Sequence, residues 1–236
     1  MRRISPLFIA IFFYATVTDG NVPIVVATGD AKRKVMKLCS DASNQLRDGD
    51  VASAKRNINE ALRIDPKLWP ALYVRAEIFA REGKYELAIQ DCDEALRQNR
   101  TFIDAALLRA NINVGRGKYA EASKEFNSLI AMRPATVTLA RALSERAWFQ
   151  ATCPDASFRN GQQAVKDAKA ACSMVAWKDE DMIDTLAAAY AESGDFDSAV
   201  RYAQQALAIK DISPRVSKRI QGHLALFQRH QPIRSG

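Results

Sequence analysis

Small apolar residues recur along this chain at a fixed interval that begins at Val35. Counted from Val35 as position one, three successive repeats have alanine at position eight, glycine at position fifteen and alanine at position twenty: Ala42, Ala76 and Ala110; Gly49, Gly83 and Gly117; Ala54, Ala88 and Ala122. A period of about 34 residues is typical of tandem helix-turn-helix hairpins. The alanines allow the two helices of a hairpin to pack closely, and each glycine supplies the positive φ that ends the first helix.

The pattern predicts five such hairpins followed by a final helix. Pro66 and Pro134 end second helices. Compared with the period of about 34 residues, the fourth copy has roughly five extra residues within segment 151–161, which reads ATCPDASFRNG. Ser213 and Pro214 form a helix start. We therefore predict an all-α solenoid over residues 35–213, with hairpins at 35–68, 69–102, 103–136, 140–178 and 180–213, a capping helix at 214–230 and a tail at 231–236.

Two of these segments admit a second interpretation. The extra residues of the fourth copy are either a functional loop or a structural variant with its own hydrogen bonds. The last helix has apolar residues on one face, which favours a cap over the open end of the array. Its basic residues leave a membrane-surface helix as the alternative: Arg215, Lys218, Arg219 and Arg229.

The repeated alanine, glycine and proline positions resemble those of the tetratricopeptide repeat family. The segments ATCPD and WKDEDMIDTLAAAYAESGDFDSAV are also similar to a repeat pair found in bacterial members. The chain departs from the family pattern at Arg100, which replaces a proline, and at Gln45 and Asn113, which replace aromatic residues. The resemblance implies a right-handed α-solenoid that acts as a non-enzymatic scaffold and binds a protein or peptide.

The resemblance also implies where a partner would bind. In this family the concave groove is formed by positions two, five, nine, twelve and thirteen of each first helix. In this chain the implied peptide-binding groove comprises Met36, Ser43, Arg47, Tyr73, Glu77, Arg81, Asp104, Leu107, Asn111, Asp184 and Glu192. Tyr73, Arg81 and Asn111 are the expected anchors, and the alternative is that all these side chains are exposed without a partner. The carboxylate clamp of the chaperone-binding members is missing, because Cys39, Ser43, Asp104 and Leu108 occupy its positions.

Complementary charges occur together at two other positions of the repeat. Position seven is arginine and position twenty-three is acidic in the second, third and fourth repeats: Arg75 with Asp91, Arg109 with Glu125, and Arg146 with Asp167. The first and fifth repeats lack both partners, with Asp41 and Asn57 in the first and Leu186 and Tyr202 in the fifth. We therefore predict an ion pair within each of these three hairpins, which fixes the register of its two helices.

Composition and candidate chemistry favour binding over catalysis. The 236 residues have a formal net charge of +7, but acidic residues alternate with the basic ones, so a nucleic-acid-binding solenoid remains only an alternative. His223 and His230 are the only histidines, and their spacing on one helix is too long for a shared metal. We expect no catalytic residues, cofactor, metal site or small-molecule substrate. A hydrolase or lyase would require acids that converge in the groove.

The four cysteines have no spacing typical of a zinc site, and the geometry of the hairpins favours free thiols: Cys39, Cys92, Cys153 and Cys172.

The N-terminal residues have the pattern of a secretory signal. A basic start, Arg2 and Arg3, precedes an apolar run of about a dozen residues, which is short for a membrane span. We predict a signal peptide or N-terminal anchor at 1–27 and a linker at 28–34. The protein is then exported to the periplasm or secreted, and any membrane contact is through this leader. The alternative is a membrane-tethered or cytosolic adaptor whose leader is not removed.

Overall fold

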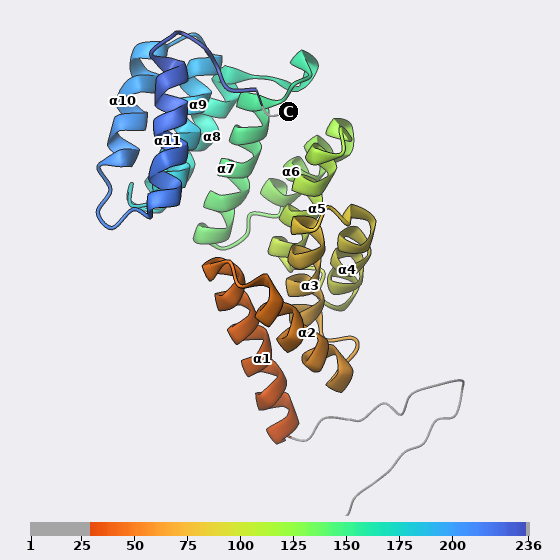
Figure 1. The fold of residues 1–236 in the computed structure, drawn as a ribbon. Coiled ribbons are helices and arrows are strands. Elements are labelled where there is room, and N and C mark those ends of the chain that lie inside the picture. Colours follow the sequence, from red (N-terminus) through yellow and green to blue (C-terminus); the bar gives the residue numbers. More distant parts are fainter. Residues whose placement is uncertain (1–28, 235–236) are drawn as a thin grey trace, which may run out of the picture. The chain divides into compact units, whose positions relative to one another are not determined.

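The structure is a computed structural model that describes residues 29–234. This part of the chain contains eleven α-helices and one 3₁₀ helix, and no strand (Figure 1). The predicted leader at 1–27 lies outside the described residues. No helix within residues 29–234 has the length and apolar character needed to cross a bilayer. The described chain forms two compact units, which divide between Leu68 and Trp69.

The first unit is one helical hairpin, α1 (Gly29–Asp48) and α2 (Val51–Ile64). Ala42 and Ala54 are fully buried where the two helices pack. The linker predicted at 28–34 is wrong, because α1 already begins at Gly29. The sequence there favours a helix, since Asp30 lies in the first turn and pairs with Arg33 one turn later.

The second unit contains four hairpins and a last helix. The hairpins are α3 (Trp69–Arg81) with α4 (Tyr85–Gln98), α5 (Ile103–Gly115) with α6 (Tyr119–Ala131), α7 (Thr136–Thr152) with α8 (Gly161–Met174), and α9 (Glu180–Glu192) with α10 (Phe196–Leu207). The last helix is α11 (Pro214–Phe227). Each second helix packs on its own first helix, and α3, α5, α7, α9 and α11 contact one another in that order.

The small residues of the repeat have the roles that their spacing predicts. The alanines at position twenty are fully buried between helices: Ala54, Ala88, Ala122 and Ala199. The glycines that follow the first helices have positive φ: Gly49, Gly83, Gly117 and Gly194. All four cysteines are buried and none forms a disulfide. Burial raises the pKa of the Cys92 and Cys172 thiols to about 12.

The fourth hairpin differs from the predicted boundaries. Helix α7 begins at Thr136 rather than at residue 140, because its first turn forms as soon as the chain passes Pro134, with Leu139 donating to the Ala135 carbonyl at 2.9 Å. The extra residues form a short 3₁₀ helix, Ala156–Phe158. The Asp155 side chain accepts from the backbone nitrogen of Ser157 at 2.9 Å. The loop is therefore held by its own hydrogen bonds, as the structural interpretation expects.

Helix α11 covers the last hairpin. Ser213 caps its N-terminus by accepting from the Val216 backbone nitrogen at 3.3 Å, and Pro214 occupies the first turn. Ile220 and Phe227 are fully buried in the core of α9 and α10. The apolar face of α11 is thus used within the chain, which favours the cap over a membrane-surface helix.

Candidate interaction surface

Three ion pairs connect the two helices of the central hairpins. The guanidinium of Arg75 donates from Nε and Nη2 to the two oxygens of Asp91, each at 2.7 Å. Arg109 donates from Nε to Glu125 at 3.0 Å. Arg146 donates to the two oxygens of Asp167 at 2.7 and 3.0 Å. Each arginine thus contacts the acid that the repeat spacing assigns to it. Since these side chains bind one another, they hold the hairpins together and are not available to a partner.

In the first hairpin, which lacks this arginine and its acidic partner, a neutral contact links the helices instead. Asn57 at position twenty-three donates to the Gln45 side chain at 3.0 Å.

The first helices of the second unit share a polar surface. Tyr73 donates its hydroxyl proton to Glu77 on α3 at 3.2 Å, Asp104 on α5 pairs with Arg141 on α7, and Asn111 on α5 donates to Glu145 on α7 at 3.2 Å. We call this surface the first-helix face and define it by Tyr73, Glu77, Asp104, Asn111, Arg141, Glu145, Trp148 and Asp181. The two polar contacts of Asp104 and Asn111 join α5 to α7, and α3, α5, α7 and α9 pack on one another in that order, so the face extends over neighbouring helices of the second unit.

Several residues of the implied groove have other roles in the structure. The placement of Leu107 in the groove is wrong, because its side chain is only 2 % exposed and packs in the core with Phe149. The prediction that Glu192 is a groove residue is also wrong, because Arg159 and Arg234 both pair with its carboxylate. Tyr73 packs against Phe102, and burial raises the pKa of its hydroxyl.

Three implied groove residues belong to the first unit. Met36 and Arg47 are exposed there, and the Ser43 hydroxyl donates to the Cys39 carbonyl at 3.0 Å. Arg81 is exposed at the end of α3 in the second unit.

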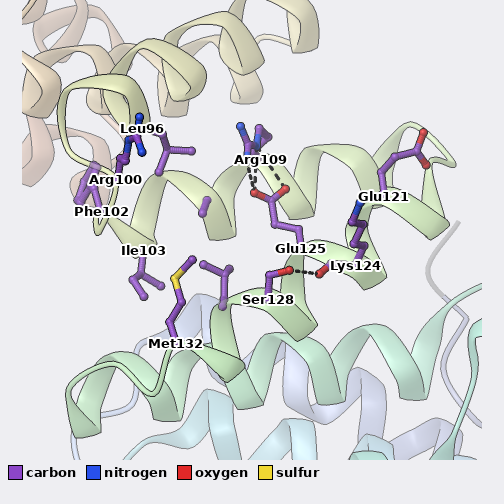
Figure 2. A pocket seen from close by; sticks show the side chains of 12 residues that line it. Leu96, Arg100, Phe102, Ile103, Arg109, Glu121, Lys124, Glu125, Ser128 and Met132 are labelled. Atoms are coloured by element: carbon purple, nitrogen blue, oxygen red, sulfur yellow. Dashed lines mark hydrogen bonds and ion pairs between the residues drawn. The ribbon is translucent and has the colours of Figure 1, made fainter.

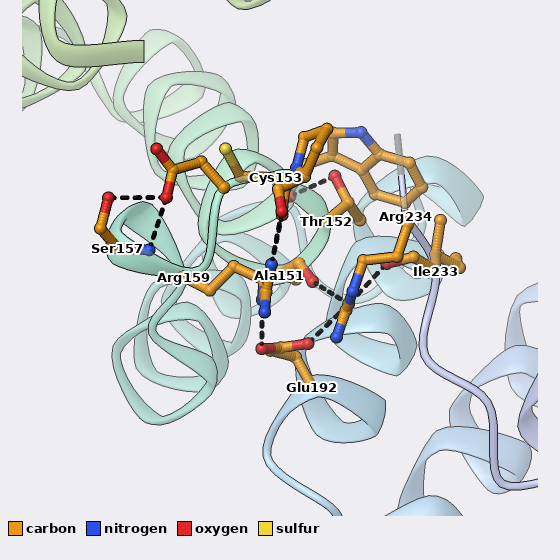
Figure 3. A network of polar contacts seen from close by, with 11 residues as sticks. Ala151, Thr152, Cys153, Ser157, Arg159, Glu192, Ile233 and Arg234 are labelled. Carbon is orange, nitrogen blue, oxygen red and sulfur yellow. Dashed lines mark hydrogen bonds and ion pairs between the residues drawn. The ribbon is translucent and has the colours of Figure 1, made fainter. Parts of the chain in front are cut away.

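The pairing of Glu192 is part of a network that the sequence analysis missed (Figure 3). Arg159 donates from Nε to Glu192 at 2.9 Å and from Nη1 to the carbonyls of Cys153 and Pro154, each at 2.9 Å. Arg234 approaches the same carboxylate to 2.7 Å. The network therefore ties together the inserted loop, the end of α9 and the C-terminal tail.

Four acidic or aromatic residues of α7 and α9, the last two first helices, line a cavity together with Arg219 of α11. This acidic pocket has a volume of about 260 Å³ and is lined by Ser144, Glu145, Trp148, Asp181, Asp184, Thr185 and Arg219. Asp184 is only 2 % exposed, and its Oδ2 lies 2.8 Å from Nδ1 of His223 and 3.8 Å from Nε of Arg219. Its Oδ1 is buried and has no hydrogen-bond partner.

The acidic pocket brings together the acids that the hydrolase alternative requires. Asp181 and Asp184 contact Arg219, and Asp184 also contacts His223, so both acids hold α11 against α9. Within residues 29–234, the Asn111 amide is the one hydrogen-bond donor to the Glu145 carboxylate. Burial raises the pKa of the Glu145 carboxyl, Asp181 adds to that rise, and Asn111 and Arg141 oppose it.

Replacing Glu145 with glutamine is expected to stabilise the chain at neutral pH. A buried acid with a raised pKa weakens folding as the pH rises from its ordinary value of 4.5 through the raised one, because the folded state holds the proton longer. The E145Q variant should therefore unfold at a higher temperature than the parent at pH 7 and at nearly the same temperature at pH 4. Thermal unfolding followed by circular dichroism measures both, with E121Q, at an exposed glutamate on α6, as the control. A lower melting temperature for E145Q at pH 7 would contradict this expectation.

A second, apolar pocket lies away from these residues, between α4, α5 and α6 (Figure 2). Its volume is about 460 Å³, and Leu96, Ile103 and Leu129 line it together with Met132, which is 59 % exposed. The Arg109–Glu125 ion pair forms part of the wall. The sequence analysis missed this pocket because its lining residues occupy ordinary seam positions of the repeat.

The matching position of the last hairpin is occupied by an aromatic ring. Tyr202 there takes the repeat position of Glu125, and its ring stacks on Trp177 with the centroids 6.0 Å apart.

Comparison with known proteins identifies the repeat. Residues 42–101 match the tetratricopeptide repeat family model. No curated protein sequence matches the chain. Among solved structures, a thermophilic tetratricopeptide repeat protein from Thermus thermophilus is 16 % identical, covers 81 % of this chain and 100 % of its own, and superposes with a TM-score of 0.69.

Two further structures show the same fold. The Pseudomonas aeruginosa protein pilF is 14 % identical over 84 % of this chain and 90 % of its own, with a TM-score of 0.63. The APC/C heterotetramer Cut9–Hcn1 is 19 % identical over 88 % of this chain and 39 % of that chain, with a TM-score of 0.67. At these identities the likeness concerns the fold. Residues 42–101 thus carry the tetratricopeptide repeat, and the described helices have the solenoid fold of these repeat proteins.

Proposed function

We propose that this protein is a non-enzymatic scaffold that binds an extended segment of a partner protein on the first-helix face. The tetratricopeptide repeat fold suggests a protein-interaction scaffold. The observation that supports this particular surface is the continuous contact of α3, α5, α7 and α9, which brings side chains of four helices onto one face. An extended segment can contact several repeats at once on such a face.

The position of the acids supports a scaffold over a hydrolase. Asp181 and Asp184 contact basic side chains of α11, and these contacts fasten the last helix to the array. Asn111 and Arg141 are exposed on the same face, and beyond their contacts with Glu145 and Asp104 each has further N–H groups that a partner could use. The face thus presents both donors and acceptors, as a peptide backbone requires.

We propose that the scaffold is located in the cell envelope, because the first residues have the basic start and apolar run of a secretory signal. N-terminal sequencing of the protein recovered from a bacterial host tests this location. A start after residue 27, the end of the predicted leader, in the exported fraction supports export, whereas an intact Met1 in the cytosol supports the adaptor alternative.

Selection from a displayed peptide library against the full chain tests the binding surface. We expect selected peptides to bind the N111A and R141A variants roughly tenfold more weakly, the loss typical of a contact residue in an interface. The matched controls are Q90A on α4 and Q204A on α10, both exposed on second helices. Equal binding by all four variants would refute the assignment to the first-helix face.

The nucleic-acid alternative is tested with the same preparation. A random single-stranded oligonucleotide should show no binding that falls steeply with salt. Binding that falls steeply with salt would show that basic residues contact the phosphates of the oligonucleotide. That result would favour the nucleic-acid alternative over the scaffold proposal.

A further inference from the structure

The apolar pocket between α4, α5 and α6 combines buried aliphatic side chains with one that is strongly exposed. Its volume of about 460 Å³ lies within the roughly 300–1,000 Å³ that is typical of ligand sites. Ile103 and Leu129 of its lining are buried, whereas Met132 is 59 % exposed. Methionine adapts its shape to an incoming group and is common at binding surfaces. The pocket is therefore suited to an apolar group from outside the chain.

The fifth repeat has aromatic rings at the positions that are charged at this pocket. Arg100 lies three residues before the start of the third repeat, and Trp177 lies three residues before the start of the fifth. The Trp177 ring stacks on Tyr202, which has the repeat position of Glu125. Trp177 and Tyr202 both pack against the core of the last two hairpins. The chain itself thus supplies aromatic rings in the fifth repeat, and it supplies none at the equivalent positions of the third.

The end of the second helix shows the same difference. Ile209 in the fifth repeat has the repeat position of Met132, and it is partly buried against the core of the last two hairpins. Met132 in the third repeat remains exposed beside the pocket. Covering such an apolar side chain is favourable, because it removes apolar surface from water. An aromatic ring from a partner would provide this cover.

The charged side chains of the pocket favour an acidic partner. The lining has three basic and two acidic residues, and Arg109 pairs with Glu125. Arg100 and Lys124 then remain with Glu121 alone, which leaves an excess of one positive charge. Opposite charge on a partner favours its approach and its correct register. An acidic residue next to the ring would match this excess.

A basic side chain already lies over an aromatic ring at the equivalent place in the fifth repeat. Arg201 has the repeat position of Lys124, and its guanidinium carbon lies 5.0 Å from the centroid of the Tyr202 ring. Cations in this position are attracted to the face of the ring. Lys124 is placed to make the same contact with a ring that enters the pocket.

A second copy of this chain does not supply such a ring. Within residues 29–234 no Trp, Tyr or Phe side chain is exposed, since each is at least partly buried. The N-terminal apolar run contains Phe8, Phe12 and Phe13, but Arg2 and Arg3 precede it and would bring positive charge to a pocket that already has an excess. The ring is therefore expected from another protein.

We propose that the apolar pocket binds an aromatic side chain of a partner protein, with an acidic residue next to it in the partner sequence. The ring lies against Ile103 and Met132, and the acid pairs with Arg100, all of which line the pocket (Figure 2). This site goes beyond the proposed function, because it shares no residue with the first-helix face. A partner would thus contact the protein at two separate places.

Nuclear magnetic resonance of the full chain, labelled at the methionine methyl groups, tests the pocket directly. The probe is the blocked peptide Ac-Ala-Glu-Trp-Glu-Ala-NH₂. One variant peptide has leucine in place of tryptophan, and another has lysines in place of the glutamates. We expect the probe to shift the methyl signal of Met132, which the M132L variant assigns, and both variant peptides to bind at least threefold more weakly. No shift of Met132 by the probe, or equal affinity for all three peptides, would overturn the proposal.

Replacing Arg100 with tryptophan tests the comparison between the repeats. Arg100 is exposed, so R100W should fold, and its indole should occupy the pocket in place of the partner's ring. We expect R100W to bind the probe at least tenfold more weakly than the parent. R100A should lose less affinity, because it removes the cation and leaves the pocket empty. The matched control is Q90W, at an exposed position of α4 outside the pocket, which should bind as the parent does. Undiminished binding by R100W would refute the assignment to this pocket.

The same variants separate this inference from the proposed function. Peptides selected on the first-helix face should bind R100W as they bind the parent, and the tryptophan probe should bind N111A as it binds the parent. If the probe is lost in N111A and kept in R100W, the ring binds the first-helix face and this inference fails while the scaffold stands. If the probe is lost only in R100W and no displayed peptide depends on Asn111 or Arg141, the pocket stands and the first-helix face fails.

A leader variant tests whether the chain fills its own pocket. The F8A/F12A/F13A/Y14A variant removes the aromatic residues of the N-terminal run. It should bind the probe with the affinity of the parent. Binding that appears only in this variant would show that the pocket is occupied by the chain's own N-terminal run, and the inference of a separate partner would fail.

Discussion

Replacing Arg146 with alanine is expected to lower the free energy of unfolding by about 3 kcal/mol, the cost of breaking one side of a buried ion pair. The Arg146 side chain is 16 % exposed and that of Asp167 only 6 %. Arg146 also donates to Asn127 at 2.7 Å, and Asp167 also accepts from Gln163 at 2.9 Å. The R146A variant leaves the Asp167 carboxylate buried without its cation. Chemical denaturation followed by circular dichroism measures the loss.

Two matched variants locate the source of this effect. R75A breaks the equivalent pair in the second repeat, where the arginine is 34 % exposed and water can replace part of its interaction. Its expected cost is smaller, about 1–2 kcal/mol. The double variant R146L/D167L removes both charges and should be more stable than R146A. If R146A and R75A lost the same stability, burial of the pair would not be the cause.

Replacing Gly161 with alanine is expected to cost about 3 kcal/mol, near the upper end for overpacking. A Cβ at Gly161 would lie 2.6 Å from the backbone nitrogen of Ser193 and 2.8 Å from the carbonyl carbon of Glu192. Backbone atoms cannot move aside as a flexible side chain can, so the start of α8 and the end of α9 must separate. Thermal and chemical denaturation of G161A measure the cost.

Gly222 provides the control for this prediction. It lies within α11, and a Cβ there has nothing within 4 Å. G222A should therefore stabilise the chain by up to about 1 kcal/mol, the difference in helix propensity between the two residues. A G161A variant as stable as the parent would show that α8 and α9 are free to move apart.

The repeat itself could be predicted from the sequence because it depends on local spacing. Alanines that pack within a hairpin and glycines that end its first helix recur at the same positions, so their roles follow from the period. The three ion pairs could be predicted for the same reason, since each joins two positions of one repeat. The buried Ala88 and the Arg109–Glu125 pair are examples.

Features that depend on contacts between repeats could not be predicted in this way. Leu107 occupies a groove position of the period, but in the structure it is covered by the next hairpin. Asp184 is buried by His223, which follows it by 39 residues on a helix outside the repeat. Gly161 resembled an ordinary loop residue, and only the approach of α9 gives it a steric role.

The three central ion pairs have a consequence for how the array could change in length. Each arginine has its main acidic partner inside its own hairpin. Duplication of a whole hairpin therefore adds both members of the ion pair and leaves no unpaired buried charge. The contacts of Arg219 with Asp181 and of His223 with Asp184 join α9 to α11 at the C-terminal end of the array. Genetic expansion or contraction should accordingly be tolerated among residues 69–178 and poorly tolerated at residues 180–227, where α9 and α11 are joined.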